Sequence, residues 1–442
     1  MIGPLLVWLG LFAALVVFVV GRPREGGGLV LAYALGMALI HIPGLLPFLD
    51  PSYVLGAYET RVGIHLTLIG MAAFVAGAWM AKASDGPIRP LPPPPRTFER
   101  FGLWALATGV VSYFIVLPVA ARVPSLTAIV SPLGTLLVLG LWLRLYSATL
   151  RDEPVKVGQT LLVLPILPMA TLSTAGFIGY GIYWVISVVA FQFVIARRRL
   201  WFYISAPIVV FLGLSLFVAY MGDRTGIRDL VWNERASLGD RLERVSEIFT
   251  HFRPLDLNSP DHVAALNDRL NQNFLVGAGV EQHLQGQSPF LHGGTIPVWS
   301  FIPRAFWPDK PAIGGGRDIV SNFTGIPFSE DTSVGAGQVL EFYMNFGVPG
   351  VVVGFAVLGF VLFRLDRGIL RALGRGDLAA MVKFAMPGLT LLAPGGNLME
   401  ILIAVITSIA CAYLLGHAIK AFGFGGRSPG RATAQTWRAR TG

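Results

Sequence analysis

The residues best suited to bind a phosphate and a sugar lie in one polar stretch, Met221 to Asn345, of an otherwise apolar chain. Arginine presents a planar fork of donors that matches phosphate oxygens, and aromatic faces stack on the C–H surfaces of sugar rings. The stretch therefore predicts one pocket for a pyrophosphate and a glycan. The alternative is that the rings mark the membrane interface and the cations are solvated. The side chains concerned are Arg269, Trp299, Phe301, Arg304, Phe306, Trp307, Lys310 and Arg317.

Glu341 is the most informative acidic residue, because it lies at the edge of the apolar run that follows the polar stretch. A carboxylate at such a boundary costs free energy unless it is paired or used. Three roles stay open: a general base, an ion-pair partner of Arg304 or Arg317, or a structural cap. The rival bases in the same stretch are Glu281, His283 and His292.

Several kinds of site are excluded by motifs that the sequence lacks. The histidines of the polar stretch do not have the i, i+4 pairing of a zinc-binding helix. Neither a Gly-x-x-x-x-Gly-Lys phosphate loop nor a Gly-x-Ser-x-Gly elbow is present. We therefore expect no metal and no cofactor. The basic residues are scattered between apolar runs, which argues against nucleic acid as a partner, and the single cysteine, Cys411, permits no intramolecular disulfide.

The composition predicts an all-α polytopic membrane protein. Hydrophobic residues make up 54% of the 442 residues and charged residues 13%, against about 25% charged in a soluble domain. Apolar runs of this length are typical of membrane-spanning helices. We expect about eleven transmembrane helices, near 4–20, 29–48, 62–80, 101–119, 126–145, 159–172, 175–196, 201–220, 347–363, 378–392 and 398–421.

Charge predicts the orientation and the domain organisation. The polar stretch carries 10 of the 34 Lys and Arg residues and 15 of the 25 Asp and Glu residues. With eleven spans the strongly basic connections all fall on one side, which the positive-inside rule makes cytoplasmic. We expect residues 1–220 to hold helices 1–8, 221–345 to form a large periplasmic loop with the active site, and 346–421 to hold helices 9–11. Residues 422–442 then form a basic, disordered cytoplasmic tail.

Local patterns predict some order within the loop. Ser237 to Thr250 has apolar residues at helical spacing, which predicts an amphipathic helix. Asp261 is placed to cap a second helix that runs to about Phe274. From Gly277 to Ser333 we expect irregular structure. Three histidines in or beside the spans are expected to be structural hydrogen-bonding groups: His41, His65 and His417.

Four segments carry a family resemblance: Asp268-Arg269 with the helix that follows, Phe290 to Thr295, Ile302 to Pro311, and Gly335 to Gly350. Together they resemble the bacterial oligosaccharide-repeat-unit polymerases, the Wzy-type polymerases of O-antigen and exopolysaccharide. The resemblance is specific over about Asp261 to Phe363. Elsewhere it consists of a similar number of spans and one large external loop late in the chain.

The resemblance implies a GT-C-like, membrane-embedded glycosyltransferase of the bacterial inner membrane that is inverting and metal-independent. Such an enzyme transfers a growing glycan from undecaprenyl pyrophosphate to the non-reducing end of a second lipid-linked repeat unit. The partners implied are this lipid-linked oligosaccharide as donor and acceptor, the bilayer, and a chain-length regulator and a flippase of the same pathway.

The resemblance also implies roles for individual residues. Arg304 and Arg269, with Lys310 and Arg317, would bind the leaving pyrophosphate, and Trp299 and Trp307 would contribute to the substrate site. Glu341 is the first choice for the base that deprotonates the acceptor hydroxyl, and His292 is the second.

Three other functions stay open. The first is an O-antigen-ligase-like transferase, which shares the scaffold and the chemistry but differs in its acceptor. The second is a transporter of the lipid-linked glycan, which should carry polar residues in the middle of its spans; among the expected spans Lys383 and Glu400 are the exceptions to an apolar composition. The third is a structural subunit of a polysaccharide assembly machine.

Overall fold

The computed structural model describes residues 2–20, 26–50, 52–83, 91, 94–120, 126–175, 178–196, 200–232, 239–240, 243, 247, 252–290, 307, 316–329, 332 and 334–421. In this part of the chain every regular element is a helix. Eight helices are long and apolar enough to cross a membrane, and the bent pair 29–49 makes a ninth if it is one span. The shorter apolar helices Gly179–Ile195 and Leu378–Thr390 are further candidates. An all-helical protein with many apolar helices is therefore confirmed, and the count of eleven spans stays a prediction.

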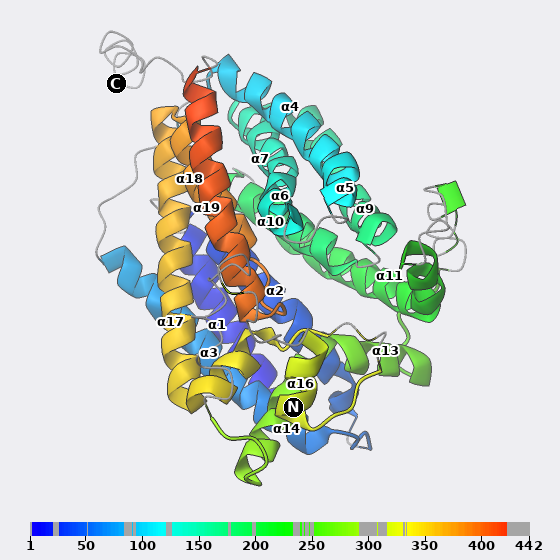
Figure 1. The fold of residues 1–442 in the computed structure, drawn as a ribbon. Helices are drawn as coiled ribbons and strands as arrows, with labels where there is room; N and C mark the ends of the chain where they lie inside the picture. Colours follow the sequence, from blue (N-terminus) through cyan, green and yellow to red (C-terminus); the bar gives the residue numbers. More distant parts are fainter. Residues whose placement is uncertain are drawn as a thin grey trace.

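The helices follow one another with short connections through most of the chain (Figure 1). Those before the polar stretch are α1 (Ile2–Val20), α2 (Leu29–His41), η1 (Pro43–Leu49), α3 (Ala57–Ala83), α4 (Arg96–Val111), η2 (Ser112–Val116), α5 (Leu117–Ala120), α6 (Leu126–Val130), η3 (Ser131–Gly134), α7 (Thr135–Leu150), α8 (Pro154–Leu162), α9 (Ile166–Ala175), α10 (Gly179–Ile195) and α11 (Leu200–Trp232). Those after it begins are α13 (Pro260–Leu270), α14 (Gln272–Leu284), α16 (Gly316–Thr324), α17 (Gly337–Arg375), α18 (Leu378–Thr390) and α19 (Leu398–Ala421).

Proline accounts for several interruptions within the expected spans. The predicted helix over 29–48 is α2 followed by the 3-10 helix η1, bent by 43°, and Pro43 and Pro47 both lie in η1. The predicted short helix over 159–172 is α8 and α9, separated by a turn that contains Pro165. Proline lacks the N–H that an internal helical turn requires, so the ladder of hydrogen bonds breaks at these points.

The two helices on either side of the polar stretch are longer than their apolar runs. α11 continues past Tyr220 to Trp232, and α17 covers Gly337 to Arg375, whereas the sequence predicted a span over 347–363. The predicted loop boundaries at 221 and 345 therefore fall inside helices. Hydropathy locates only the apolar part of a helix, and the added turns carry polar and charged residues.

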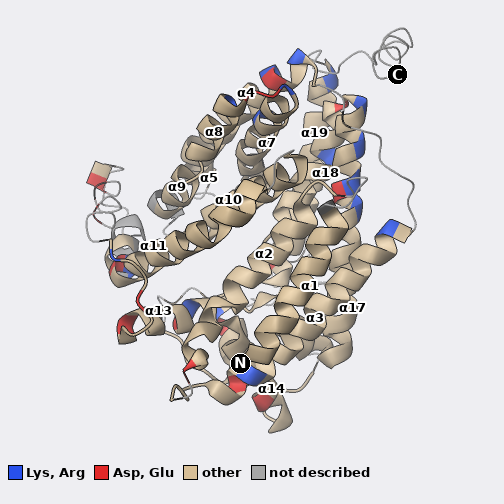
Figure 2. Cartoon of the chain, turned by 180° about the vertical axis from the view of Figure 1, so that it is seen from behind, with Lys and Arg blue, Asp and Glu red and all other residues tan. Residues whose placement is uncertain are grey.

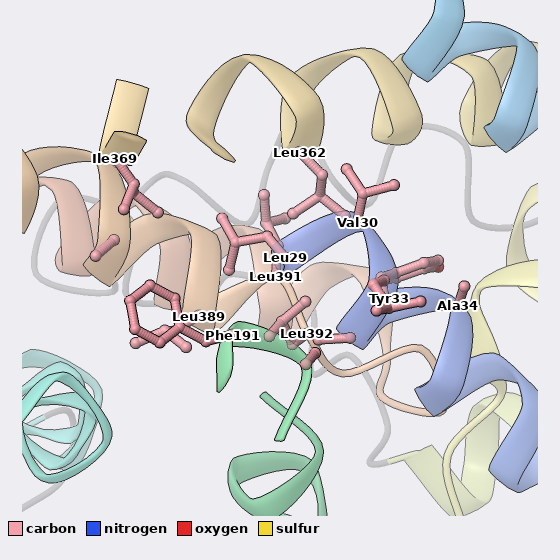
Figure 3. Close-up of a cluster of buried hydrophobic side chains, with 14 of the residues drawn as sticks. Leu29, Val30, Tyr33, Ala34, Phe191, Leu362, Ile369, Leu389, Leu391 and Leu392 are labelled. Carbon is pink, nitrogen blue, oxygen red and sulfur yellow. The ribbon is translucent and has the colours of Figure 1, made fainter. Parts of the chain in front are cut away.

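Helix α2 is the centre of the core. Its residues Leu29 to Ala34 are all buried. Figure 3 shows Leu29, Val30, Tyr33 and Ala34 among side chains from α10, α17, the end of α18 and the residues that follow it. A helix that is buried on every side carries apolar residues around its whole circumference, as this sequence does. The other labelled members of the cluster are Phe191, Leu362, Ile369, Leu389, Leu391 and Leu392.

Glycines allow α3 to approach its neighbours closely. Gly63, Gly70 and Gly77 recur every seven residues on α3. A Cβ on Gly77 would lie 1.9 Å from the carbonyl oxygen of Ala356 in α17, and a Cβ on Gly63 would lie 1.9 Å from that of Asn273 in α14. Small residues at helix contacts let backbones pack directly, as is common in membrane proteins.

The two ends of the bundle differ in charge and in covering structure. α1 begins at the end where α13, α14 and α16 lie, and α19 ends at the opposite end (Figure 1). Figure 2 shows Lys and Arg gathered at the end where α17 and α19 finish and α4 begins. Arg151 and Lys156 there form ion pairs with Glu99, at 2.7 and 3.8 Å.

The described part of the polar stretch is more helical than predicted. Ser259, not Asp261, is the residue before the second helix, because Pro260 occupies its first turn. The helix breaks at Asn271 (φ −123°, ψ 64°), and α14 then continues to Leu284. Irregular structure over 277–333 was thus a wrong prediction for residues 277–284 and 316–324, which are helical. The predicted helix Ser237 to Thr250 lies almost wholly outside the described residues, as does the tail 422–442.

A buried polar network fastens α14 to the bundle. The Nδ1 of His41 donates to Asn273 Oδ1 at 2.8 Å, and Asn273 Nδ2 donates to the carbonyl of His41 at 2.7 Å. The hydroxyl of Thr67 in α3 donates to the same Asn273 oxygen at 3.1 Å. His41 is thus a structural hydrogen-bonding group, as predicted. So is His417, whose Nδ1 donates to the carbonyl of Tyr413 at 2.8 Å.

Candidate functional site

A break at Gly347 separates the first ten residues of α17 from the rest of the helix. Gly347 has φ 64° and ψ −159°, a conformation that favours glycine. The helix also starts at a glycine of positive φ, Gly337 (72°). Residues 337–346 therefore form a short helical piece whose direction is set independently of the long apolar part, and this piece carries Glu341.

Glu341 lies at the junction between this piece and the start of α19. Its side chain is 7% exposed, and its Oε2 accepts a hydrogen bond from the backbone N–H of Leu398, the first residue of α19. The N–H groups of the first turn have no partner within their helix and carry the positive end of its dipole. One of the three roles left open by the sequence, a structural cap, is therefore present in the structure.

The connection from α18 to α19 runs from Leu391 to Asn397, and its residues from Pro394 onward contact the segment that begins α17. The N–H of Gln338 donates to the carbonyl of Pro394 at 3.0 Å, and the N–H of Ala336 donates to Asn397 Oδ1 at 3.1 Å. A Cβ on Gly335 would lie 2.2 Å from the carbonyl oxygen of Gly395, so the two segments touch backbone to backbone.

Glu400 is a second carboxylate at the same junction, and sequence reasoning missed it as a site residue. It is exposed and accepts a hydrogen bond from Asn397 Nδ2 at 3.0 Å. It lies near enough to Glu341 for the two negative charges to repel each other. Its charge also opposes ionisation of the Tyr180 hydroxyl of α10. The available signal was its position at the start of the last apolar run, where a charge is unusual.

Side chains from three further helices complete the polar surroundings. The Tyr33 hydroxyl of α2 donates to Gln338 Oε1, and the Tyr183 hydroxyl of α10 is hydrogen-bonded to the backbone of Gly395. Gln272, the first residue of α14, lies against Gly337 and Gly395. The junction thus gathers polar groups from segments that are distant in sequence. Nothing in their spacing along the chain predicted this.

Among the cations predicted to bind pyrophosphate, Arg317 directly follows a residue, Gly316, that contacts the junction at Asn397. It is the second residue of α16, and a Cβ on the first, Gly316, would lie 2.7 Å from Asn397 Nδ2. Arg317 is half-exposed, and its Nε donates to Asp318 at 2.9 Å. The start of α16 and Glu341 therefore meet the same short segment, 397–398.

The other predicted site residues are placed as follows. Arg269 lies in the last turn of α13, half-buried, three residues before Gln272. Trp307 is half-buried. Outside the described residues are His292, Trp299, Arg304 and Lys310.

Two of the rival bases make local contacts. His283 Nδ1 donates to the carbonyl of Ser288 at 2.8 Å, and its ring stacks on Phe290 with the centroids 3.6 Å apart. Glu281 accepts a hydrogen bond from Gln285 at 3.1 Å. These contacts give His283 a structural role in the turn after α14.

Neither a family model, nor a curated protein sequence, nor a solved structure matches the chain. Within the described residues no three His, Cys, Asp or Glu side chains come together as a metal site would require. The chemistry of the junction is therefore argued from its own groups. A buried carboxylate, an exposed carboxylate, two tyrosine hydroxyls and a nearby arginine can accept a proton, orient a hydroxyl and attract an anion.

Proposed function

We propose that this protein polymerises undecaprenyl-pyrophosphate-linked oligosaccharide repeat units into O-antigen or exopolysaccharide at the periplasmic face of the bacterial inner membrane. The single observation that carries the proposal is the junction at Glu341. There a carboxylate, a second acid and the start of the arginine-bearing helix α16 meet at one end of an apolar helical bundle. A reaction between two lipid-linked sugars needs such polar groups at a membrane boundary.

In the proposed reaction the oxygen of an acceptor sugar hydroxyl forms the new bond to the anomeric carbon of the donor. The bond from that carbon to the pyrophosphate breaks, and undecaprenyl pyrophosphate leaves with the electron pair. The hydroxyl proton passes to a carboxylate of the junction, with Glu341 as first choice. Arg304, Arg269, Lys310 and Arg317 neutralise the departing pyrophosphate without a metal.

The charge distribution supports the proposed orientation. Lys and Arg gather at the end opposite α13, α14 and α16 (Figure 2), and the positive-inside rule makes such an end cytoplasmic. The helical layer with α13, α14 and α16 then belongs on the periplasmic side. A reporter that is active only in the periplasm should work when fused after Ser288 and stay silent when fused after Gly374. The reverse pattern would overturn this orientation.

The function is tested in a strain from which the gene is deleted, with lipid-linked and surface glycans resolved by size. Deletion should leave single repeat units, and complementation should restore a ladder of lengths. Long polymer that stays on the lipid carrier would instead indicate a ligase. Single units that accumulate only on the cytoplasmic side would indicate a transporter.

Arg304 provides a residue-level test of the same proposal. Arg304→Ala should abolish polymer, because the leaving pyrophosphate loses a charge-assisted contact, while protein level and membrane insertion stay normal. Arg253→Ala is the matched control, since Arg253 is an exposed cation of the same stretch. Normal polymer in the Arg304 variant would show that this arginine does not hold the pyrophosphate.

A further inference from the structure

Lys383 is a cation on an apolar helix. It is the sixth residue of α18, between Val382 and Phe384, and it is half-buried. At 1.5 Å per residue it lies about 8 Å from the start of that helix. A charge at this depth in a membrane-spanning bundle requires a partner or a path to the surface.

The contact found for the Lys383 ammonium is an aromatic ring. Nζ lies 4.1 Å from the centroid of the Tyr413 ring of α19, and no carboxylate of the described residues pairs with it. Gly416 makes the geometry possible, because a Cβ there would lie 3.2 Å from Lys383 Cε. The lysine stem therefore lies across α19 and places its charge on the outward-facing side of the helix pair.

A strip of polar groups continues from this contact toward the end of α19. Tyr413, His417 and Lys420 follow at intervals of four and three residues, so they share one face of the helix, and all three are exposed. His417 uses Nδ1 to bond the carbonyl of Tyr413, which leaves its other ring nitrogen for an external partner. Exposed apolar side chains follow Lys383 and Tyr413 directly in the chain, namely Phe384 (37% exposed) and Leu414 (73% exposed).

We propose that the strip formed by Lys383, Tyr413, His417 and Lys420 binds the phosphate headgroup of an anionic phospholipid, with the acyl chains along Phe384 and Leu414. Among the described residues the contact of the Lys383 ammonium is the Tyr413 ring, and an anion would complete it. The neighbouring apolar side chains suit a lipid better than a free phosphate. His417 and Lys420 belong to the last turns of α19, and α19 finishes at the basic end of the bundle (Figure 2), where a negative bilayer surface is attracted. This site is independent of the proposed enzymatic function.

The test uses the purified full chain in nanodiscs of phosphatidylglycerol and phosphatidylcholine, with the retained lipids counted by native mass spectrometry. Lys383→Met keeps the length and helix preference of the side chain and should lower the preference for phosphatidylglycerol about fivefold, the effect expected of one basic residue near an anionic surface. Lys383→Arg should retain the preference. Equal preference in Lys383→Met and the unchanged protein would overturn the proposal.

Two further variants separate this site from a general effect of charge. Lys82, in the last turn of α3, is the matched control, since its ammonium lies 5.0 Å from the centroid of the Phe18 ring of α1. Lys82→Met should leave the preference unchanged, and an equal loss in both lysine variants would contradict a specific site. Tyr413→Phe should retain binding because the ring remains, whereas Tyr413→Ala should weaken it. Full binding by Tyr413→Ala would also contradict the proposed strip.

Discussion

Asp366 and Glu341 are two buried carboxylates of the same helix, α17, and each lies at the N-terminus of another helix. Asp366 accepts the backbone N–H groups of Gly28, Leu29 and Val30 at 3.2, 2.9 and 3.3 Å, at the start of α2. Glu341 accepts one backbone N–H, that of Leu398. One carboxylate is therefore saturated by donors, whereas the other retains acceptor capacity.

The surroundings of the two carboxylates also differ: Asp366 is enclosed, and Glu341 lies near an exposed acid. Asp366 is closed in by α2, and a Cβ on Gly26 would lie 2.8 Å from its Oδ2. Glu341 lies near an exposed acid, Glu400, and near the segment that the start of α16 touches. The comparison teaches that burial alone does not mark a functional carboxylate, because a buried acid whose lone pairs are all engaged serves the fold. It also weakens the transporter hypothesis, since Asp366 offers no open position to a passing substrate.

The largest expected effect comes from Glu341→Gln. Glutamine keeps the shape and can still accept the N–H of Leu398, but it cannot take a proton from the acceptor. Polymer synthesis should fall roughly 100-fold or more, in the range typical of a lost general base, with the free energy of unfolding nearly unchanged. The glycan length in complemented cells checks the loss of synthesis, and unfolding of the purified protein in detergent checks its stability. Wild-type polymer from this variant would mean that Glu341 is only a cap.

Asp366→Ala tests the structural role assigned to Asp366. Three N–H groups would lose their acceptor inside the bundle, so the free energy of unfolding should fall by about 3 kcal/mol. The protein that remains folded should still polymerise. Asp377→Ala is the matched control, because Asp377 caps α18 at an exposed site through Ala380 at 2.9 Å, and it should cost about 1 kcal/mol. Loss of polymer without loss of stability in the Asp366 variant would give this residue a chemical role.

Gly28→Ala tests the same contact, that of Asp366 with the first N–H groups of α2, by a change in α2. Gly28 has φ 109°, and a Cβ there would lie 2.8 Å from the backbone nitrogen of Phe191. The substitution should cost about 2 kcal/mol of unfolding free energy, the scale of a strained backbone. Gly374→Ala is the control, since a Cβ at that helical position meets nothing within 4 Å. Equal stability of the two variants would show that α2 is not held as described.

Much of the fold could be predicted from the sequence, because apolar runs and prolines act locally. The candidate spans lie near the expected places, and His41 has the expected structural role. The ends of α11 and α17 could not be predicted, since their extra turns are polar and form by packing rather than by hydropathy. The choice of Asp261 as a cap failed because Pro260 fits the first turn of a helix and moves the cap to Ser259.

The site was only partly accessible to sequence reasoning. Glu341 could be singled out, because a carboxylate at the edge of an apolar run is unusual. Its partner Leu398, by contrast, lies 57 residues away in the chain, and the contribution of Tyr33 comes from a helix near the other terminus. Such partners are set by how α2, α10, α17 and α19 pack, and no local pattern encodes them. Glu400 was treated as an isolated charge for the same reason.

The most direct measurement is a transfer assay with the purified full chain in liposomes that contain a lipid-linked oligosaccharide repeat unit, with a chelator present and the products resolved by size. The account predicts a ladder of longer lipid-linked glycans, released undecaprenyl pyrophosphate, and no ladder from the Glu341→Gln protein. If the unchanged protein leaves the repeat unit at its original size, or if it only moves that unit across the bilayer, the proposed polymerase function is contradicted.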